Sequence, residues 1–188
     1  MPKFESIFAV AAIGSAVLVS SLQPASAREA INTFGSDHNI AISGLDAVAF
    51  FMQNKAVQGK EPISYQWKGA TWLFSSEADR ALFAANPEKY APQWGGYCAV
   101  GIAEGHVSRN LVKGSYDIRD GKLYLFAAGK PGDFDQWRKV WLEKDGGAAS
   151  HVSAGSANWT ILKARVEAGE EAPKLDSKPP VSTAAAAN

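Results

Sequence analysis

The sequence predicts an α+β fold in which small antiparallel hairpins are packed by short helices, arranged as a single domain. Two segments alternate aromatic and β-branched residues around a two-residue turn, and several other segments carry apolar residues at helical spacing. These elements do not follow one another in a regular β-α-β order. At 188 residues, the chain is long enough for one domain and two terminal extensions. The sequence alone indicates no internal repeat of fixed period.

The two ends of the chain are predicted to lie outside this domain. Residues 1–27 combine an apolar run with the small residues Ala25-Ser26-Ala27, a pattern typical of a cleaved export signal, which predicts a periplasmic or secreted protein. The apolar run is too short to serve comfortably as a membrane span, so we expect no integral span after cleavage. An N-terminal extension (28–39) then precedes the domain (40–168). A disordered tail (169–188), rich in Pro, Ala, Ser and charge, follows it.

The charge balance excludes one class of partner. The chain has 19 basic and 19 acidic residues, and removal of the export signal takes one of each. A neutral chain gives no electrostatic reason to expect nucleic acid or an anionic membrane surface as a partner.

The elements of the first half follow from local signals. Residues 44–53 are predicted to form a short helix whose N-cap is Asp46. Residues 63–74 form a hairpin around Lys68-Gly69. Residues 75–90 form a helix that is capped at Ser76 and interrupted at Asn86-Pro87.

Local signals of the same kind predict the elements of the second half. Residues 116–126 form a hairpin around the turn Asp120-Gly121. Residues 131–147 form an amphipathic helix that ends at two glycines, and residues 156–169 form the last helix. Five tryptophans at strand or helix spacing are predicted to pack in the core: Trp67, Trp72, Trp137, Trp141 and Trp159.

The only cysteine, Cys98, lies in "YAPQWGGYCAVGIAEGH", residues 90–106. Three interpretations remain open from spacing alone. A buried thiol is common because cysteine is among the most buried residue types. The paired glycines Gly95-Gly96 also suit a loop that presents the sulfur to a ligand, with Trp94 placed to shield it. The sulfur then serves either as a nucleophile or, with His106, as a ligand for a soft metal such as Cu(I).

The remaining histidines do not extend this site. His38 is expected on the surface, and His151 is expected to be exposed in a loop ahead of the last helix. One thiol and three scattered histidines lack the ligand spacing of a structural zinc site.

Several motifs resemble the exported YHS-domain proteins: "ISGLDAVAFF", the block from "WKGATWLF" to "YAPQWGGYCAVGIAEG", "DGKLYLF" and "ANWTIL". The resemblance covers most of residues 40–162 and is specific in the block from Phe83 to Ala99. Ala47, Phe50 and Trp94 replace the usual Pro, Tyr and Tyr.

This resemblance has two implications. Shorter YHS domains on heavy-metal transport ATPases are thought to bind metal through cysteines that this chain lacks, so that function does not carry over. The exported subgroup keeps the cysteine, and some relatives carry selenocysteine at the position of Cys98, which implies a chemically engaged atom there.

The leading hypothesis is therefore an exported YHS-type protein that binds a soft metal ion, copper above others, through Cys98, with His106 as a second ligand. The alternative is a thiol oxidoreductase or peroxide-reactive protein with Cys98 as the catalytic nucleophile, regenerated by an external thiol. The third hypothesis is a non-catalytic interaction module.

Overall fold

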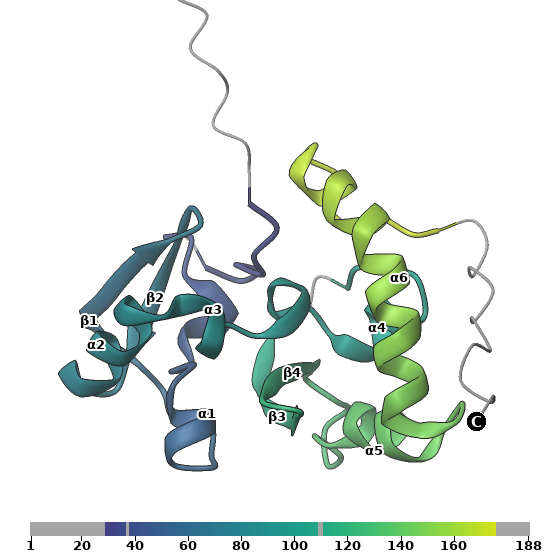
Figure 1. Cartoon of the computed structure of the whole chain (residues 1–188), viewed down its shortest axis with the longest axis horizontal. Coiled ribbons are helices and arrows are strands. Elements are labelled where there is room, and N and C mark those ends of the chain that lie inside the picture. Colours follow the sequence, from purple (N-terminus) through teal and green to yellow (C-terminus); the bar gives the residue numbers. More distant parts are fainter. Residues whose placement is uncertain (1–28, 37, 109–110, 176–188) are drawn as a thin grey trace, which may run out of the picture.

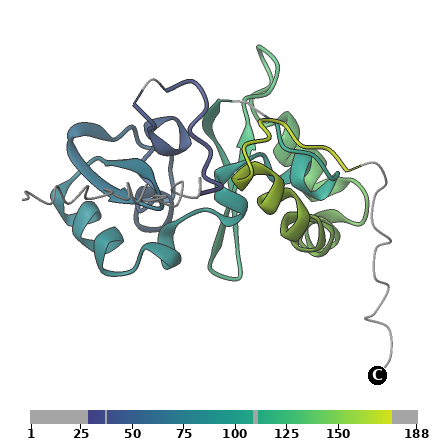
Figure 2. The same cartoon turned by 90° about the horizontal axis from the view of Figure 1, so that it is seen from above.

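The computed structural model describes residues 29–36, 38–108 and 111–175, and confirms an α+β architecture. The hairpin β1–β2 with helices α1–α3 forms one side of the molecule and helices α4–α6 form the other, with the hairpin β3–β4 between them (Figures 1 and 2). None of the helices in this described part has the length and apolar character needed to cross a bilayer. The predicted export signal lies outside the described residues.

The chain runs through two similar series of elements. The first consists of the 3₁₀ turn η1 (Ala41–Gly44), α1 (Ala49–Met52), β1 (Lys60–Trp67), β2 (Ala70–Phe74), α2 (Glu77–Ala85) and α3 (Pro87–Tyr90). The second consists of η2 (Gln93–Gly96), α4 (Ala99–Ala103), β3 (Val112–Arg119), β4 (Lys122–Ala127), α5 (Gln136–Glu143) and α6 (Gly147–Glu167).

The local signals act as predicted. Both hairpin turns, Lys68-Gly69 and Asp120-Gly121, have positive φ at both residues, the conformation of a tight hairpin turn. The Ser76 side chain accepts a hydrogen bond from the backbone N–H of Asp79 at the start of α2. Asn86 caps α3 in the same way, with Pro87 in its first turn.

The prediction that the chain has no internal repeat is wrong, because η1, β1 and β2 recur 52 residues later as η2, β3 and β4. Ile42, Ser43 and Gly44 of η1 have φ of 45°, 58° and 77°, and the residues 52 positions later in η2 have 52°, 65° and 78°. Each left-handed turn leads through an extended residue into a short helix. An antiparallel hairpin follows in each series. Its register shifts between the first and the fifth residue of the first strand.

Sequence identities at this offset are few. They fall at the structurally equivalent points: "GLDAV" (44–48) corresponds to "GYCAV" (96–100), and the strand ends Leu73-Phe74 and Leu125-Phe126 are the same. A few short matches separated by unrelated residues do not form a periodic pattern that can be recognised in the sequence. The backbone geometry shows the repeat.

Two hydrophobic cores meet at strand β4. Leu123 and Leu125 face the core of the first half, with Trp72 and Phe83 among its members. Tyr124 and Phe126 face the second core, around Trp141. Alternating side chains of a strand point to opposite faces, so β4 is buried on both sides and joins the two halves. All five tryptophans predicted to pack are buried or half-buried in these cores.

The structure revises both predicted domain boundaries. Ala30 and Asn32, assigned to the N-terminal extension, are buried, and the N–H of Asn32 donates to the carbonyl of Gly95. At the other end, Pro173 accepts from the N–H of Val107, and Leu175 donates to the carbonyl of Gly105. Residues 169–175 of the predicted tail are thus part of the ordered domain, and 176–188 lie outside the described residues.

Candidate functional site

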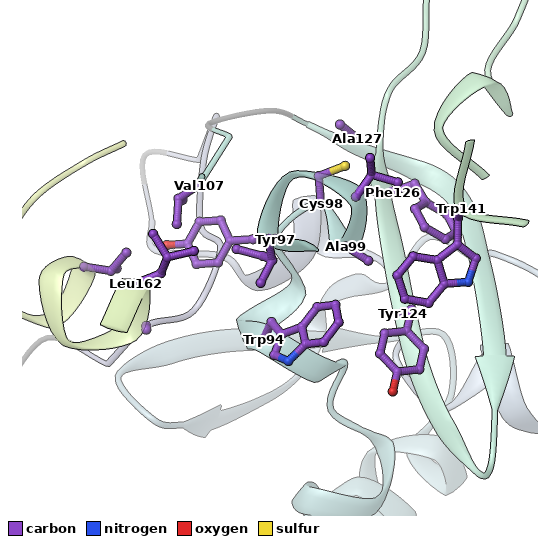
Figure 3. Packing of buried hydrophobic residues seen from close by; sticks show 14 of the residues in the cluster. Trp94, Tyr97, Cys98, Ala99, Val107, Tyr124, Phe126, Ala127, Trp141 and Leu162 are labelled. Atoms are coloured by element: carbon purple, nitrogen blue, oxygen red, sulfur yellow. The ribbon is translucent and has the colours of Figure 1, made fainter. Parts of the chain in front are cut away.

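Cys98 is the residue that directly precedes helix α4, after the left-handed turn η2. It is 6% exposed and belongs to the core of the second half. Figure 3 shows its sulfur directed toward the end of strand β4, near Ala127. The loop does not present the thiol to solvent, and the sulfur lies inside the protein.

Three backbone amides surround this sulfur. The backbone N–H groups of Ala127, Gly101 and Val100 face it closely enough to act on the pKa of the thiol. Burial raises the pKa of the Cys98 thiol above its ordinary value, and the negative charge of Glu104 acts in the same direction. The three amides lower the pKa, but burial outweighs them. At neutral pH the thiol is protonated.

The repeat pairs Cys98 with Asp46, which lies 52 positions earlier. Oδ1 of Asp46 accepts from the N–H groups of Val48 and Ala49 at 2.9 and 3.2 Å, and Oδ2 accepts from the N–H of Ser75 at 2.8 Å. Val100, Gly101 and Ala127 are the counterparts of these three residues. We call Val48, Ala49 and Ser75 the first amide site, and Val100, Gly101 and Ala127 the second amide site. Asp46 was predicted to be the N-cap, but the N-cap of α1 is Val48; Asp46 lies two residues earlier and accepts from the N–H groups of Val48 and Ala49.

His106 lies beside the same short helix. A Cβ atom placed on Gly101 would stand 3.2 Å from Nε2 of His106 and 3.1 Å from Oγ of Ser108. Gly101 is three residues after Cys98, so the two positions share one face of α4. The structure therefore places Nε2 of His106 against the same short helix that Cys98 precedes. The side chain of His106 is 34% exposed, and its Nδ1 lies 4.0 Å from Oε2 of Glu104.

Gly101 has an ordinary helical backbone, so no positive φ requires a glycine there. Glycine in a helix interior costs about 1 kcal/mol relative to alanine. What the missing side chain provides is space, which the imidazole of His106 and the hydroxyl of Ser108 fill. The absent side chain at Gly101 therefore lets His106 approach the helix turn that holds the thiol.

The other histidines are not part of this arrangement. His38 is exposed, as predicted. The prediction for His151 is wrong: it is 4% exposed, because α6 begins at Gly147 and carries it against α5. Its ring stacks on Trp141, and its Nδ1 bonds the carbonyl oxygens of Trp141 and Gly147. Within the described ranges, no three His, Cys, Asp or Glu side chains gather as metal ligands.

The residues around the glycine pair serve packing. A Cβ on Gly95 would stand 1.8 Å from the carbonyl oxygen of Ala30, and Gly96 accepts from the side-chain amide of Asn32. Trp94 contacts the rings of Tyr124 and Trp141 and packs closely over Gly155 of α6. In Figure 3 the indole of Trp94 lies on the other side of the α4 turn from the sulfur. The glycine pair admits the N-terminal segment around Ala30, and the amides near the sulfur come from other residues.

A buried acidic pair in the first half was not predicted. Oγ of Ser75 lies 2.7 Å from Oδ2 of Asp46 and 3.1 Å from Oδ2 of Asp79. Burial raises the pKa of the Asp46 carboxyl, and the charge and hydrogen bond of Asp79 add to this, against the lowering effect of the Ser75 amide and hydroxyl. A single hydroxyl donates one proton, so two charged carboxylates cannot both be satisfied through it. The raised pKa means that Asp46 binds a proton more tightly in the folded chain than an ordinary Asp does.

This proton predicts a pH dependence. Because the folded-state pKa of Asp46 is raised, the folded chain holds a proton that the unfolded chain releases, and stability falls as pH rises from the ordinary Asp value of about 4 through the raised value. Asp79→Asn removes the neighbouring charge. We expect the melting temperature of this variant, relative to the unsubstituted chain, to rise by about 2–4 °C between pH 4 and pH 7. Calorimetry over this range measures it; Asp120→Asn, at an exposed turn residue, is the control and should show no such trend.

Comparison with known proteins does not show which family this chain belongs to. No family model matches it, and neither a curated protein nor a solved structure matches it at the significance required. The site is therefore interpreted from its own geometry.

Proposed function

We propose that the chain is an exported YHS-type protein that binds one soft metal ion, Cu(I), through the sulfur of Cys98 and Nε2 of His106. The observation that carries the proposal is the placement of these two donors on either side of Gly101, which has no side chain to separate them. Cu(I) accepts two-coordinate sites with soft ligands, so it suits one thiolate and one imidazole. Zinc, which takes four ligands in closed sites, suits them less.

The environment of Cys98 favours a ligand over a nucleophile. A nucleophilic cysteine is accessible and has a lowered pKa, whereas Cys98 is buried and burial raises its pKa. A metal ion displaces the thiol proton when it binds, so a raised pKa weakens the apparent affinity at low pH without abolishing binding. We therefore place the thiol oxidoreductase behind metal binding as the alternative.

Cu(I) titration under anaerobic conditions, against a chromogenic competitor, tests the proposal. We expect one equivalent to bind, Cys98→Ser to abolish binding, and His106→Gln to weaken it at least about tenfold, because one of two ligands is lost. Below the thiol pKa, affinity should rise about tenfold per pH unit, since one proton leaves the sulfur for each ion bound. His38→Gln, at an exposed histidine outside the site, is the matched control and should bind as the unsubstituted chain does.

A second variant tests the geometry without removing a ligand. Gly101→Ala should weaken Cu(I) binding, because its Cβ would stand 3.2 Å from Nε2 of His106 and displace the ring. Equal Cu(I) binding by the unsubstituted chain and by Cys98→Ser would overturn the proposal. Unchanged affinity in both His106→Gln and Gly101→Ala would remove His106 from it.

A further inference from the structure

The repeat carries an inference about the second amide site that does not depend on metal binding. We infer that this site is built to hold a carboxylate-like anion, and that Cys98 is an oxidation site whose cysteine sulfinate is that anion. The first amide site supplies the independent observation. There the same three backbone positions, 52 residues earlier, hold the carboxylate of Asp46.

The two sites agree donor by donor. In each, two amides come from the first turn of a short helix that follows a left-handed turn, and the third comes from the residue at the end of the second hairpin strand. The side-chain donor differs. Oγ of Ser75 lies 2.7 Å from Oδ2 of Asp46, whereas Ala127, at the equivalent position, has no hydroxyl. The second amide site therefore retains all three backbone donors and lacks only the side-chain donor.

A cysteine sulfinate has the same branching as an aspartate side chain. In both, one atom attached to Cβ bears two oxygens that share a negative charge. In the position of Asp46, one oxygen accepts from two helix amides and the other from the strand amide. The same assignment gives one sulfinate oxygen the N–H groups of Val100 and Gly101 and the other that of Ala127. A neutral thiol, a weak acceptor, uses these three donors poorly.

The oxidant required is a hydroperoxide, with hydrogen peroxide as the simplest case. The thiolate attacks one peroxide oxygen, the O–O bond breaks, and the products are the sulfenate and water. A second peroxide molecule oxidises the sulfenate to the sulfinate and again leaves water. Each step transfers one oxygen and two electrons. Because the sulfur is buried, we expect the reaction to be slow.

Substitution tests whether the second amide site accepts a carboxylate. Cys98→Asp introduces the isostere of the sulfinate, and Cys98→Asn is the matched neutral control, whose amide nitrogen cannot accept from an N–H. We expect the Asp variant to fold and to melt at or above the temperature of the unsubstituted chain at pH 7. The Asn variant should melt about 5 °C or more below the Asp variant, because one buried amide loses its acceptor. An Asp variant that is unfolded, or less stable than the Asn variant, overturns the inference.

Oxidation of the unsubstituted full chain provides the second test. After treatment with hydrogen peroxide, the tryptic peptide of residues 90–109, which contains Cys98 and no methionine, should gain two oxygens on the sulfur and no third. The oxidised chain should melt above the reduced one. A folded chain that takes up no oxygen, a product that proceeds to three oxygens, or a lower melting temperature after oxidation each overturns the inference. Mass and melting temperature need no copper, so a failed Cu(I) titration leaves this test intact.

Discussion

Trp141→Ala is expected to reduce the free energy of unfolding by about 3–5 kcal/mol, the range for removing a large buried aromatic side chain. Trp141 is 0% exposed, and its ring contacts those of Tyr124, Phe126 and His151. Its Nε1–H donates to Oδ2 of Asp117 at 3.0 Å, so truncation also removes a hydrogen bond. Urea unfolding followed by circular dichroism measures the loss.

Trp159→Ala is the control for the size of the side chain removed. Trp159 is half-buried on α6, and one ring contact, to Tyr97 at 6.1 Å, is found for it in the described part of the chain. We expect it to cost less, because part of its apolar surface stays in water in the folded state. Equal losses at the two positions would show that the second core is not centred on Trp141.

Gly95→Ala is expected to prevent folding or to cost about 3 kcal/mol or more. The backbone at Gly95 has φ of 65°, and the added Cβ would stand 1.8 Å from the carbonyl oxygen of Ala30. Relief of this overlap requires the segment around Ala30 to move, which breaks the hydrogen bond between Asn32 and Gly95. Thermal unfolding of the variant and of the unsubstituted chain measures the effect.

Gly69→Ala separates backbone strain from overlap. Gly69 has φ of 69°, nearly that of Gly95, and nothing lies within 4 Å of its Cβ position. We expect a cost of about 1 kcal/mol from the left-handed backbone alone. The difference between the two variants is the contribution of the Ala30 contact. Similar costs would mean that the glycine is needed for its conformation and not to admit residues 30–32.

These contacts change how the paired glycines of the "WGGYC" segment are understood. The sequence suggested a loop that presents a thiol and wraps amides around a ligand. In the structure, Gly95 admits a backbone carbonyl and Gly96 bonds Asn32, while the sulfur points inward. The amides around the sulfur are those of residues two, three and twenty-nine positions further on. The chemical interest of Cys98 rests on those amides and on His106.

Local sequence signals determined most of the secondary structure. The turns Lys68-Gly69 and Asp120-Gly121, the caps at Ser76 and Asn86 and the stop before Pro87 each act over a few residues, so the sequence contains all the information they need. The predicted α+β class followed from these elements. Helix α4 was missed because five residues rich in small side chains give no helical periodicity.

Burial and the placement of distant groups depend on contacts between residues far apart in sequence. His151 was expected in a loop because nothing local shows that α6 starts at Gly147 and packs on α5. Ser75 and Asp79 meet Asp46 across about thirty positions, and Ala127 meets Cys98 across a similar interval. The sequence by itself determined the elements and singled out Cys98. Only the tertiary structure decided that the sulfur is buried, that His106 lies against Gly101 and that Asp46 is the counterpart of Cys98, because strand pairing and core packing bring those groups together.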